Sequence, residues 1–161
     1  MYKNKFISFG KPYLGSAELK SVKKVINSAW LGTGEITNKF EKKFIKNKKT
    51  KFAVSLNSCT AALHLSILSL NLKKNDEIIT TPMTFASTIN SIILAGAKPI
   101  LADIQSDSFN IDPKQILKKI NKKTKAILIV HFAGLPCDMN KIISISKKYN
   151  IRIIEDCAHA I

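Results

Sequence analysis

The chain has 161 residues, of which 45% are hydrophobic, a composition that is typical of a folded domain and that excludes disordered and fibrous proteins. No apolar run approaches the roughly 20 residues of a membrane-spanning helix, and we expect no membrane partner. The net charge of +15 is compatible with nucleic-acid binding, but all but one of the 26 basic residues are lysines. Because nucleic-acid recognition relies on arginine, we interpret the lysines as solvated helix faces and expect no nucleic-acid partner.

The cysteines and the first residues indicate a cytoplasmic protein. Three cysteines without a CxxC spacing suit a reducing compartment better than a disulfide scaffold. The opening "MYKNKFISFG" has a basic start but no sustained apolar stretch, so we expect no secretory signal.

Two helices are predicted in the first fifty residues. Apolar residues recur at helical spacing over 16–29, so we expect a helix there, capped by Ser16. A second helix is expected after Thr37. Between them the two glycines of "WLGTGE" indicate a loop.

From residue 51 onward, short apolar runs alternate with segments of helical periodicity. The predicted elements are, in chain order, a strand over 51–55, a helix over 60–70, a strand over 77–80, a helix over 85–94 that Gly96 ends, a strand over 99–102, a helix capped by Asp112, a strand over 126–130, a helix over 139–149 and a strand over 151–154. Continuous apolar strands separated by helices predict an α/β fold with a mostly parallel sheet and helices on both faces.

Small and polar residues follow four of these strands, over 57–61, 81–85, 131–134 and 156–159. In open parallel sheets, ligands bind outside the carboxyl ends of the strands. We therefore expect these four segments to build one site.

The individual residues of these segments leave alternatives open. Ser58 and Thr60 precede a helix and could hold an anion such as phosphate, or simply cap the helix. Phe85 could stack on a planar cofactor or fill the core. Asp156 ends an apolar strand and needs a partner, which could be a protonated heterocyclic nitrogen, a lysine or a helix terminus. His159 could be structural or could contact a ligand.

Other kinds of site find no support in the sequence. The histidines and cysteines near the strand ends match no familiar zinc spacing, so we expect no metal. The sequence has no GxSxG elbow, no GxGxxG fingerprint and no GxxxxGK[ST] loop. Serine hydrolase, dinucleotide and nucleoside-triphosphate chemistry therefore lose their usual signatures.

Several collinear segments resemble one known family. They are "ISFGKPYLGSAELKSVKKVINSAWLGTGEITNKFEKKF", "VSLNSCTAALHLSILSL", "DEIITTPMTFASTINSIILAGAKPILADI", "FNID", "TKAILIVHFAGLPCDM" and "IIEDCAHA". Together they resemble the pyridoxal-phosphate-dependent nucleotide-sugar aminotransferases of the DegT/DnrJ/StrS type. The resemblance implies the large domain of the aspartate-aminotransferase fold (PLP fold type I) and pyridoxal 5′-phosphate as cofactor.

The resemblance also implies roles for particular residues. Thr60 and Ala61 match the positions that hold the cofactor phosphate at a helix start. Phe85 matches the aromatic residue that stacks on the pyridine ring. Asp156 matches the acid that pairs with the ring nitrogen, and His159 matches a residue near the phenolic oxygen.

One expected residue has no match in the chain. In this family the Schiff-base lysine follows an "SFH"-like segment downstream of "EDCAHA", and that segment is absent here. We therefore expect an amino-terminal fragment, with a helical segment over 1–50 and an incomplete PLP-binding α/β domain over 51–161. The fragment alone is expected to be inactive.

For the full-length protein, the resemblance implies amino transfer from glutamate to a keto group of a nucleotide-linked sugar, for surface polysaccharide or glycan biosynthesis. It also implies a homodimer, with His131 and the "WLGTG" loop lining the substrate cleft. Two alternatives stay open: a nucleotide-sugar dehydratase on the same scaffold, and a truncated, non-catalytic paralogue.

Overall fold

The computed structural model of the chain describes residues 10–161. The first nine residues, on which the expected absence of a secretory signal rests, lie outside the described residues. The chain divides into two compact units, with the boundary between Ser55 and Leu56. No helix in the described part of the chain is long and apolar enough to cross a membrane.

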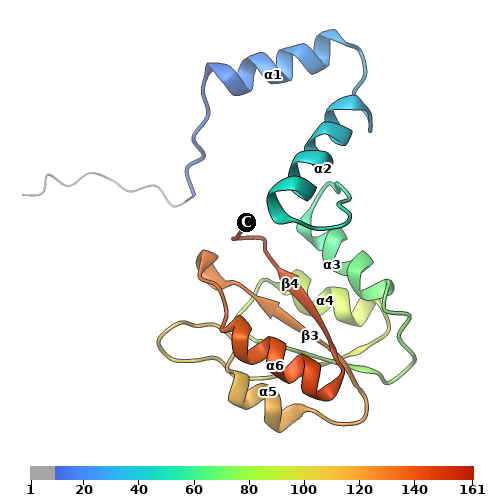
Figure 1. Cartoon of the computed structure of the whole chain (residues 1–161), viewed down its shortest axis with the longest axis vertical. Coiled ribbons are helices and arrows are strands. Elements are labelled where there is room, and N and C mark those ends of the chain that lie inside the picture. The colour runs from blue at the N-terminus through green and yellow to red at the C-terminus, as the bar shows by residue number, and fades with distance from the viewer. Residues whose placement is uncertain (1–9) are drawn as a thin grey trace, which may run out of the picture. The chain divides into compact units, whose positions relative to one another are not determined.

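The first unit contains two helices, α1 (Ser16–Asn27) and α2 (Glu35–Lys48), in agreement with the two predicted helices (Figure 1). The predicted cap is wrong by one residue, because Gly15 holds the N-cap position and its N–H donates to Glu18 Oε2 at 2.7 Å. The loop between the helices is closed by the indole of Trp30, whose Nε1 donates to the Thr33 carbonyl at 3.0 Å.

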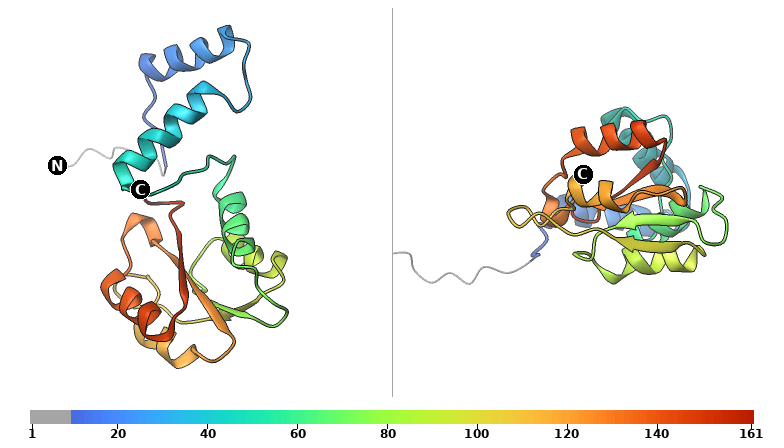
Figure 2. Two further views of the ribbon diagram at one scale, coloured as in Figure 1. Left: turned by 45° about the vertical axis from the view of Figure 1, so that its right-hand side comes forward. Right: turned by 90° about the horizontal axis from the view of Figure 1, so that it is seen from below.

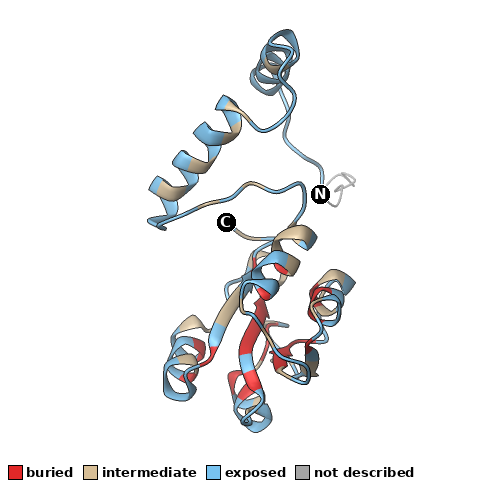
Figure 3. Ribbon diagram, turned by 90° about the vertical axis from the view of Figure 1, so that its right-hand side faces the viewer, coloured by how far each residue is buried: buried red, intermediate tan, exposed pale blue. Residues whose placement is uncertain are grey.

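Neither of these helices contains a buried residue, as the pale colouring of Figure 3 shows. The large apolar side chains exposed on them are Leu19, Val22, Ile26, Ile36, Phe40 and Phe44. These helices are amphipathic, yet their apolar faces are not covered within the unit itself. The first unit therefore has no buried core of its own among the described residues.

The second unit is built on a four-stranded sheet in the order β2-β1-β3-β4, with every neighbouring pair parallel. The strands are β1 (Glu77–Thr80), β2 (Lys98–Leu101), β3 (Thr124–Val130) and β4 (Arg152–Asp156). All four residues of β1 and residues 126–130 of β3 are buried. Such continuous burial arises when helices cover both faces of a sheet, and the predicted parallel α/β fold is confirmed.

Helices cover the two faces of the sheet in pairs (Figures 1 and 2). The bounds are α3 (Cys59–Leu68) and α4 (Ala86–Leu94) on one face, and α5 (Pro113–Lys119) and α6 (Met139–Tyr149) on the other. Successive strand residues point to opposite faces. Accordingly, Ile78 packs in the cluster that contains Leu63 of α3, while Ile79 packs in the cluster that contains Ile142 of α6.

The ends of these helices follow from local chemistry. Asp112 accepts a hydrogen bond from the Lys114 N–H at 2.8 Å, with Pro113 at the first helical position, as the sequence predicts. Gly96 lies just beyond α4 with φ +80°, a left-handed conformation that glycine adopts at little cost. These signals are local, and the predicted bounds of α6 and β1 agree with the structure.

The predicted strand over 51–55 is wrong. These residues form no strand and pair with no other strand, and Phe52 and Val54 are exposed. The side chains favour a strand, but a strand also needs a neighbouring backbone for its hydrogen bonds. No described residue supplies that backbone to 51–55.

Candidate active site

A cavity of about 370 Å³ opens at the carboxyl edge of the sheet. The segments that follow β1, β3 and β4 meet there with the first residues of α3. The carboxyl ends of parallel strands lie on one edge, so residues from separate loops converge there. The cavity is lined by Cys59, Thr60, Thr84, Phe85, Ser87, Phe132, Asp156, Ala158 and His159. Four of the six predicted site residues, Thr60, Phe85, Asp156 and His159, therefore meet around one space.

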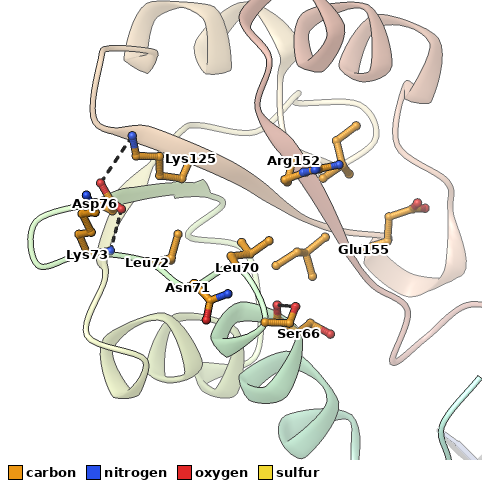
Figure 4. Close-up of a pocket in the computed structure, with 12 residues that line it drawn as sticks. Ser66, Leu70, Asn71, Leu72, Lys73, Asp76, Lys125, Arg152 and Glu155 are labelled. Atoms are coloured by element: carbon orange, nitrogen blue, oxygen red, sulfur yellow. Dashed lines mark hydrogen bonds and ion pairs between the residues drawn. The ribbon is translucent and has the colours of Figure 1, made fainter.

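A larger hollow of about 920 Å³ runs beside β4, which is an edge strand, and the segment after α3. Figure 4 shows Asp76 in this hollow, where it accepts from the Lys73 N–H at 2.8 Å and pairs with Lys125 at 3.7 Å. We place the candidate site in the smaller cavity because the buried Asp156 carboxylate lines it, whereas the larger hollow follows a sheet edge and is lined by the exposed charges of Lys73, Arg152 and Glu155.

Asp156 is the central residue of the smaller cavity. Its side chain is buried, with 4% of the residue exposed. Oδ2 accepts from the Thr88 hydroxyl at 2.8 Å, and Oδ1 accepts from the Ala158 N–H at 3.1 Å and the Cys59 thiol at 3.5 Å. All three donors are neutral, and Asp156 forms no ion pair with any described residue. A buried carboxylate without a cation is costly, so this site is suited to a cationic ligand group.

The thiol of Cys59 stays protonated beside this carboxylate. Burial, followed by the charge and hydrogen bond of Asp156, raises the pKa of Cys59 to about 11. A protonated thiol is a poor nucleophile. Cys59 thus acts as a hydrogen-bond donor to Asp156 and is not arranged as a reactive cysteine. None of the three cysteines, all within residues 10–161, forms a disulfide.

Thr60 and Phe85 lie on the rim of the cavity. Helix α3 begins at Cys59, and its cap Ser58 accepts from the Ala61 N–H at 3.2 Å, so the predicted cap is present. Ala61 itself does not line the cavity. Phe85 is 78% exposed, which rules out the core-filling alternative and leaves a flat aromatic face available to a ligand. His159 is also exposed.

His131 lies at the carboxyl end of β3 but does not line this cavity. It is buried, and its Nδ1 accepts from the Cys137 N–H at 3.1 Å. The neutral ring therefore carries its proton on Nε2, which lies 3.0 Å from Glu155 Oε2. Its expected role in lining the substrate cleft stays a prediction.

His131, Glu155 and Cys157 place one potential ligand atom each within 4.8 Å of one another. A metal on Nε2 of a neutral imidazole would need the proton on Nδ1. His131 Nδ1 already accepts from the Cys137 N–H. These three side chains are therefore arranged for hydrogen bonding and not for holding a metal.

Asn110 fixes the loop that follows His131. It is 2% exposed, and its amide donates to the carbonyls of Leu135 at 2.9 Å and Pro136 at 3.2 Å, while its Oδ1 accepts from the Phe132 N–H at 3.0 Å. Phe132 then lines the cavity. Sequence reasoning missed Asn110, Cys59 and Thr88. The local sequence carried no signal for them: Thr84 lies before α4, so helical spacing does not relate it to Thr88.

Gly134 in the same loop lies against the last site residue. Its φ is +83°, and a Cβ added to it would lie 2.9 Å from the His159 carbonyl oxygen. Gly96 has a similar φ of +80° but nothing within 4 Å of an added Cβ. Alanine substitutions at the two positions therefore distinguish the free-energy cost of a left-handed backbone, which both share, from the cost of a steric clash, which only Gly134 has.

We expect Gly134→Ala to destabilise the protein more than Gly96→Ala. Both pay about 1–2 kcal/mol for a left-handed alanine, and Gly134→Ala adds roughly 1–3 kcal/mol for overlap with backbone. Chemical denaturation of both variants measures the free energy of unfolding. Equal losses would contradict the tight contact between Gly134 and His159.

Comparison with known protein families gives one match over most of the chain. The model of the DegT/DnrJ/EryC1/StrS aminotransferase family matches residues 12–161. A curated relative, the spore coat polysaccharide biosynthesis protein SpsC of Bacillus subtilis, is 40% identical over 159 residues, covering 99% of this chain and 41% of SpsC. The chain spans about two fifths of the length of the curated relatives it matches.

Solved structures agree with this match. PseC of Helicobacter pylori, described as an aminotransferase involved in the biosynthesis of pseudoaminic acid, superposes with a TM-score of 0.91 at 32% identity, covering 97% of this chain and 42% of PseC. NtdA of Bacillus subtilis, solved with bound cofactor PMP, has a TM-score of 0.87 at 30% identity and covers 99% of this chain and 39% of NtdA. The fold of the described residues is thus the fold of part of these larger chains.

Proposed function

The chain belongs to the DegT/DnrJ/EryC1/StrS aminotransferase family, and we propose that the full-length protein transfers an amino group to a keto group of a nucleotide-linked sugar with pyridoxal 5′-phosphate as cofactor. We propose glutamate as the amino donor and a homodimer as the active form. The proposed product enters surface polysaccharide or glycan biosynthesis, in the cytoplasm. The names of SpsC and PseC, which refer to polysaccharide and pseudoaminic acid biosynthesis, support a sugar substrate.

The observation that carries the proposal is the buried Asp156 carboxylate, which accepts from three neutral donors and forms no ion pair with a described residue. When bound, pyridoxal phosphate supplies an electron sink that makes the substrate Cα–H acidic. Asp156 would hold the proton on the ring nitrogen, because a carboxylate favours a charged partner. The residues present therefore fit the cofactor.

Two further elements of the cavity suit the other parts of this cofactor. Phe85 offers an exposed aromatic face on which a planar ring can stack. Thr60 lies in the first turn of α3, where free backbone N–H groups and the helix dipole favour an anion such as phosphate. These assignments, with Ala61 beside Thr60 and His159 near the phenolic oxygen, are proposals.

No lysine lines the cavity in the part of the chain that the structure describes. We therefore expect covalent attachment of the cofactor and the general base to come from a residue outside these 161. The chain alone is expected to be inactive. The division into a helical segment over 1–50 and a PLP-binding part over 51–161 is likewise proposed for the full-length protein.

The test is to incubate the purified full-length protein with glutamate and a panel of nucleotide-linked keto sugars, and to identify products by mass spectrometry. The proposal expects an amino sugar with release of 2-oxoglutarate. Loss of a hydroxyl without gain of nitrogen would redirect the assignment to a dehydratase. A protein that neither binds pyridoxamine 5′-phosphate in a calorimetric titration nor converts any sugar would overturn the proposal.

A further inference from the structure

Thr88 has a buried hydroxyl that contacts the Asp156 carboxylate from outside the cavity. It lies on α4, has 0% of its surface exposed and is not among the residues that line the cavity. Its Oγ1 lies 2.8 Å from Asp156 Oδ2 and 2.7 Å from the hydroxyl of Thr84. Thr84 lies in the loop just before α4 and Thr88 lies in the first turn of that helix, so the entry into α4 brings the Thr84 hydroxyl to Thr88 and the Thr88 hydroxyl to Asp156.

The direction of these two hydrogen bonds follows from proton counting. An ionised carboxylate can only accept, so the single hydroxyl proton of Thr88 points to Asp156. Thr88 must then accept at its contact with Thr84, and Thr84 must donate. The result is an ordered chain of donors from Thr84 through Thr88 to Asp156, in which the first residue lines the cavity.

The same carboxylate is fixed at its other oxygen. Oδ1 accepts from Ala158 and from Cys59, while Oδ2 accepts from Thr88. Donors on both oxygens prevent rotation of the carboxylate plane about its Cβ–Cγ bond. Thr88 is the donor that holds Oδ2, and a hydrogen bond to a charged acceptor is stronger than one between neutral groups.

We propose that Thr88 is a positioning residue, whose hydroxyl orients the Asp156 carboxylate toward the ring nitrogen of the cofactor. This inference rests on the proposed function, because that function supplies the ring nitrogen. Thr88 itself does not line the cavity and acts only through Asp156. The larger hollow beside β4 carries no comparable set of convergent buried groups.

The experiment compares three variants of the full-length protein. Thr88→Val removes the hydroxyl and keeps the shape, whereas Thr88→Ser keeps the hydroxyl and removes a methyl group. Ser91→Ala is the matched control, because Ser91 is a buried hydroxyl on the same helix with no hydrogen-bond partner among the described residues. Circular dichroism establishes that each variant is folded.

Two measurements use pyridoxamine 5′-phosphate labelled with ¹⁵N in the ring. We expect Thr88→Val to weaken binding about 10-fold, the effect of losing one hydrogen bond to a charged group, and to shift the ring-nitrogen resonance toward the unprotonated form. Thr88→Ser and Ser91→Ala should bind as the unchanged protein does. Equal weakening in Thr88→Ser would show that packing and not the hydroxyl matters, and would overturn the inference.

A third measurement needs no cofactor. The Ala158 N–H donates to Asp156, so its hydrogen exchange in the cofactor-free protein should accelerate in Thr88→Val and in neither other variant. If the unchanged protein binds no pyridoxamine 5′-phosphate, the proposed function fails, and this exchange rate still decides whether Thr88 orders Asp156. If the cofactor binds but Thr88→Val changes neither the affinity for the cofactor nor the exchange rate, the inference about Thr88 is contradicted while the proposed function stands.

Discussion

Asp156→Asn is expected to lower the rate of amino transfer by the full-length protein about 100-fold or more, a typical loss when a preorganised charge is removed from an active site. Asparagine cannot carry the negative charge that holds a protonated ring nitrogen. Its amide N–H₂ would also face one of the donors that now point at the carboxylate, from Thr88, Ala158 and Cys59. The measurement is the initial rate with glutamate and the accepted sugar.

The control for this variant is Asp107→Asn, which makes the same chemical change at an exposed position. It should leave the rate unchanged. An Asp156→Asn protein that keeps its full rate would contradict the assignment of Asp156 to the ring nitrogen.

The same variant has a second readout that is independent of any cofactor. Asp156 is one of the causes, after burial, that raise the pKa of Cys59 to about 11. Removing its charge should lower that pKa, so more thiolate is present near neutral pH and Cys59 reacts faster with iodoacetamide. Mass spectrometry of the peptide that contains Cys59 measures this rate. An unchanged rate would show that burial alone keeps the thiol protonated.

Asn110→Ala is expected to destabilise the protein, with a loss of about 2–4 kcal/mol in the free energy of unfolding. The substitution removes three hydrogen bonds and leaves the Phe132 N–H and the carbonyls of Leu135 and Pro136 without their partner. Urea denaturation measures the change. We also expect weaker binding of pyridoxamine 5′-phosphate, because Phe132 lines the cavity.

Asn140→Ala provides the comparison for this prediction. Asn140 is exposed on α6, so its substitution should change the free energy of unfolding by less than about 0.5 kcal/mol. Similar values for the two variants would mean that Asn110 does not hold the loop as its contacts indicate.

Sequence patterns predicted the parallel α/β unit because each of its signals is local. Apolar runs of strand length identified β1, β3 and β4, and the cap formed by Asp112 with Pro113 identified the start of α5. The convergence of Thr60, Phe85, Asp156 and His159 on one cavity also followed, since carboxyl ends of parallel strands share an edge. Their proposed roles rest on family resemblance.

The strand predicted over 51–55 failed for the opposite reason. Its side chains satisfy a local pattern, but a strand exists only where another backbone accepts and donates its hydrogen bonds, and no described residue does so. Phe85 shows the same limit, because the local sequence left open whether its ring fills the core or faces a ligand, and the fold leaves the ring exposed.

By itself, the sequence determined the order and type of most elements, the edge of the sheet that carries the polar residues, and the family. Only the tertiary structure decided what Asp156 contacts: Thr88 lies 68 positions away in the sequence and Cys59 lies 97 positions away. Contacts over such separations depend on strand register and on how helices pack against the sheet. Local periodicity contains neither, so hydrogen-bond partners of buried groups emerge only when the chain is folded.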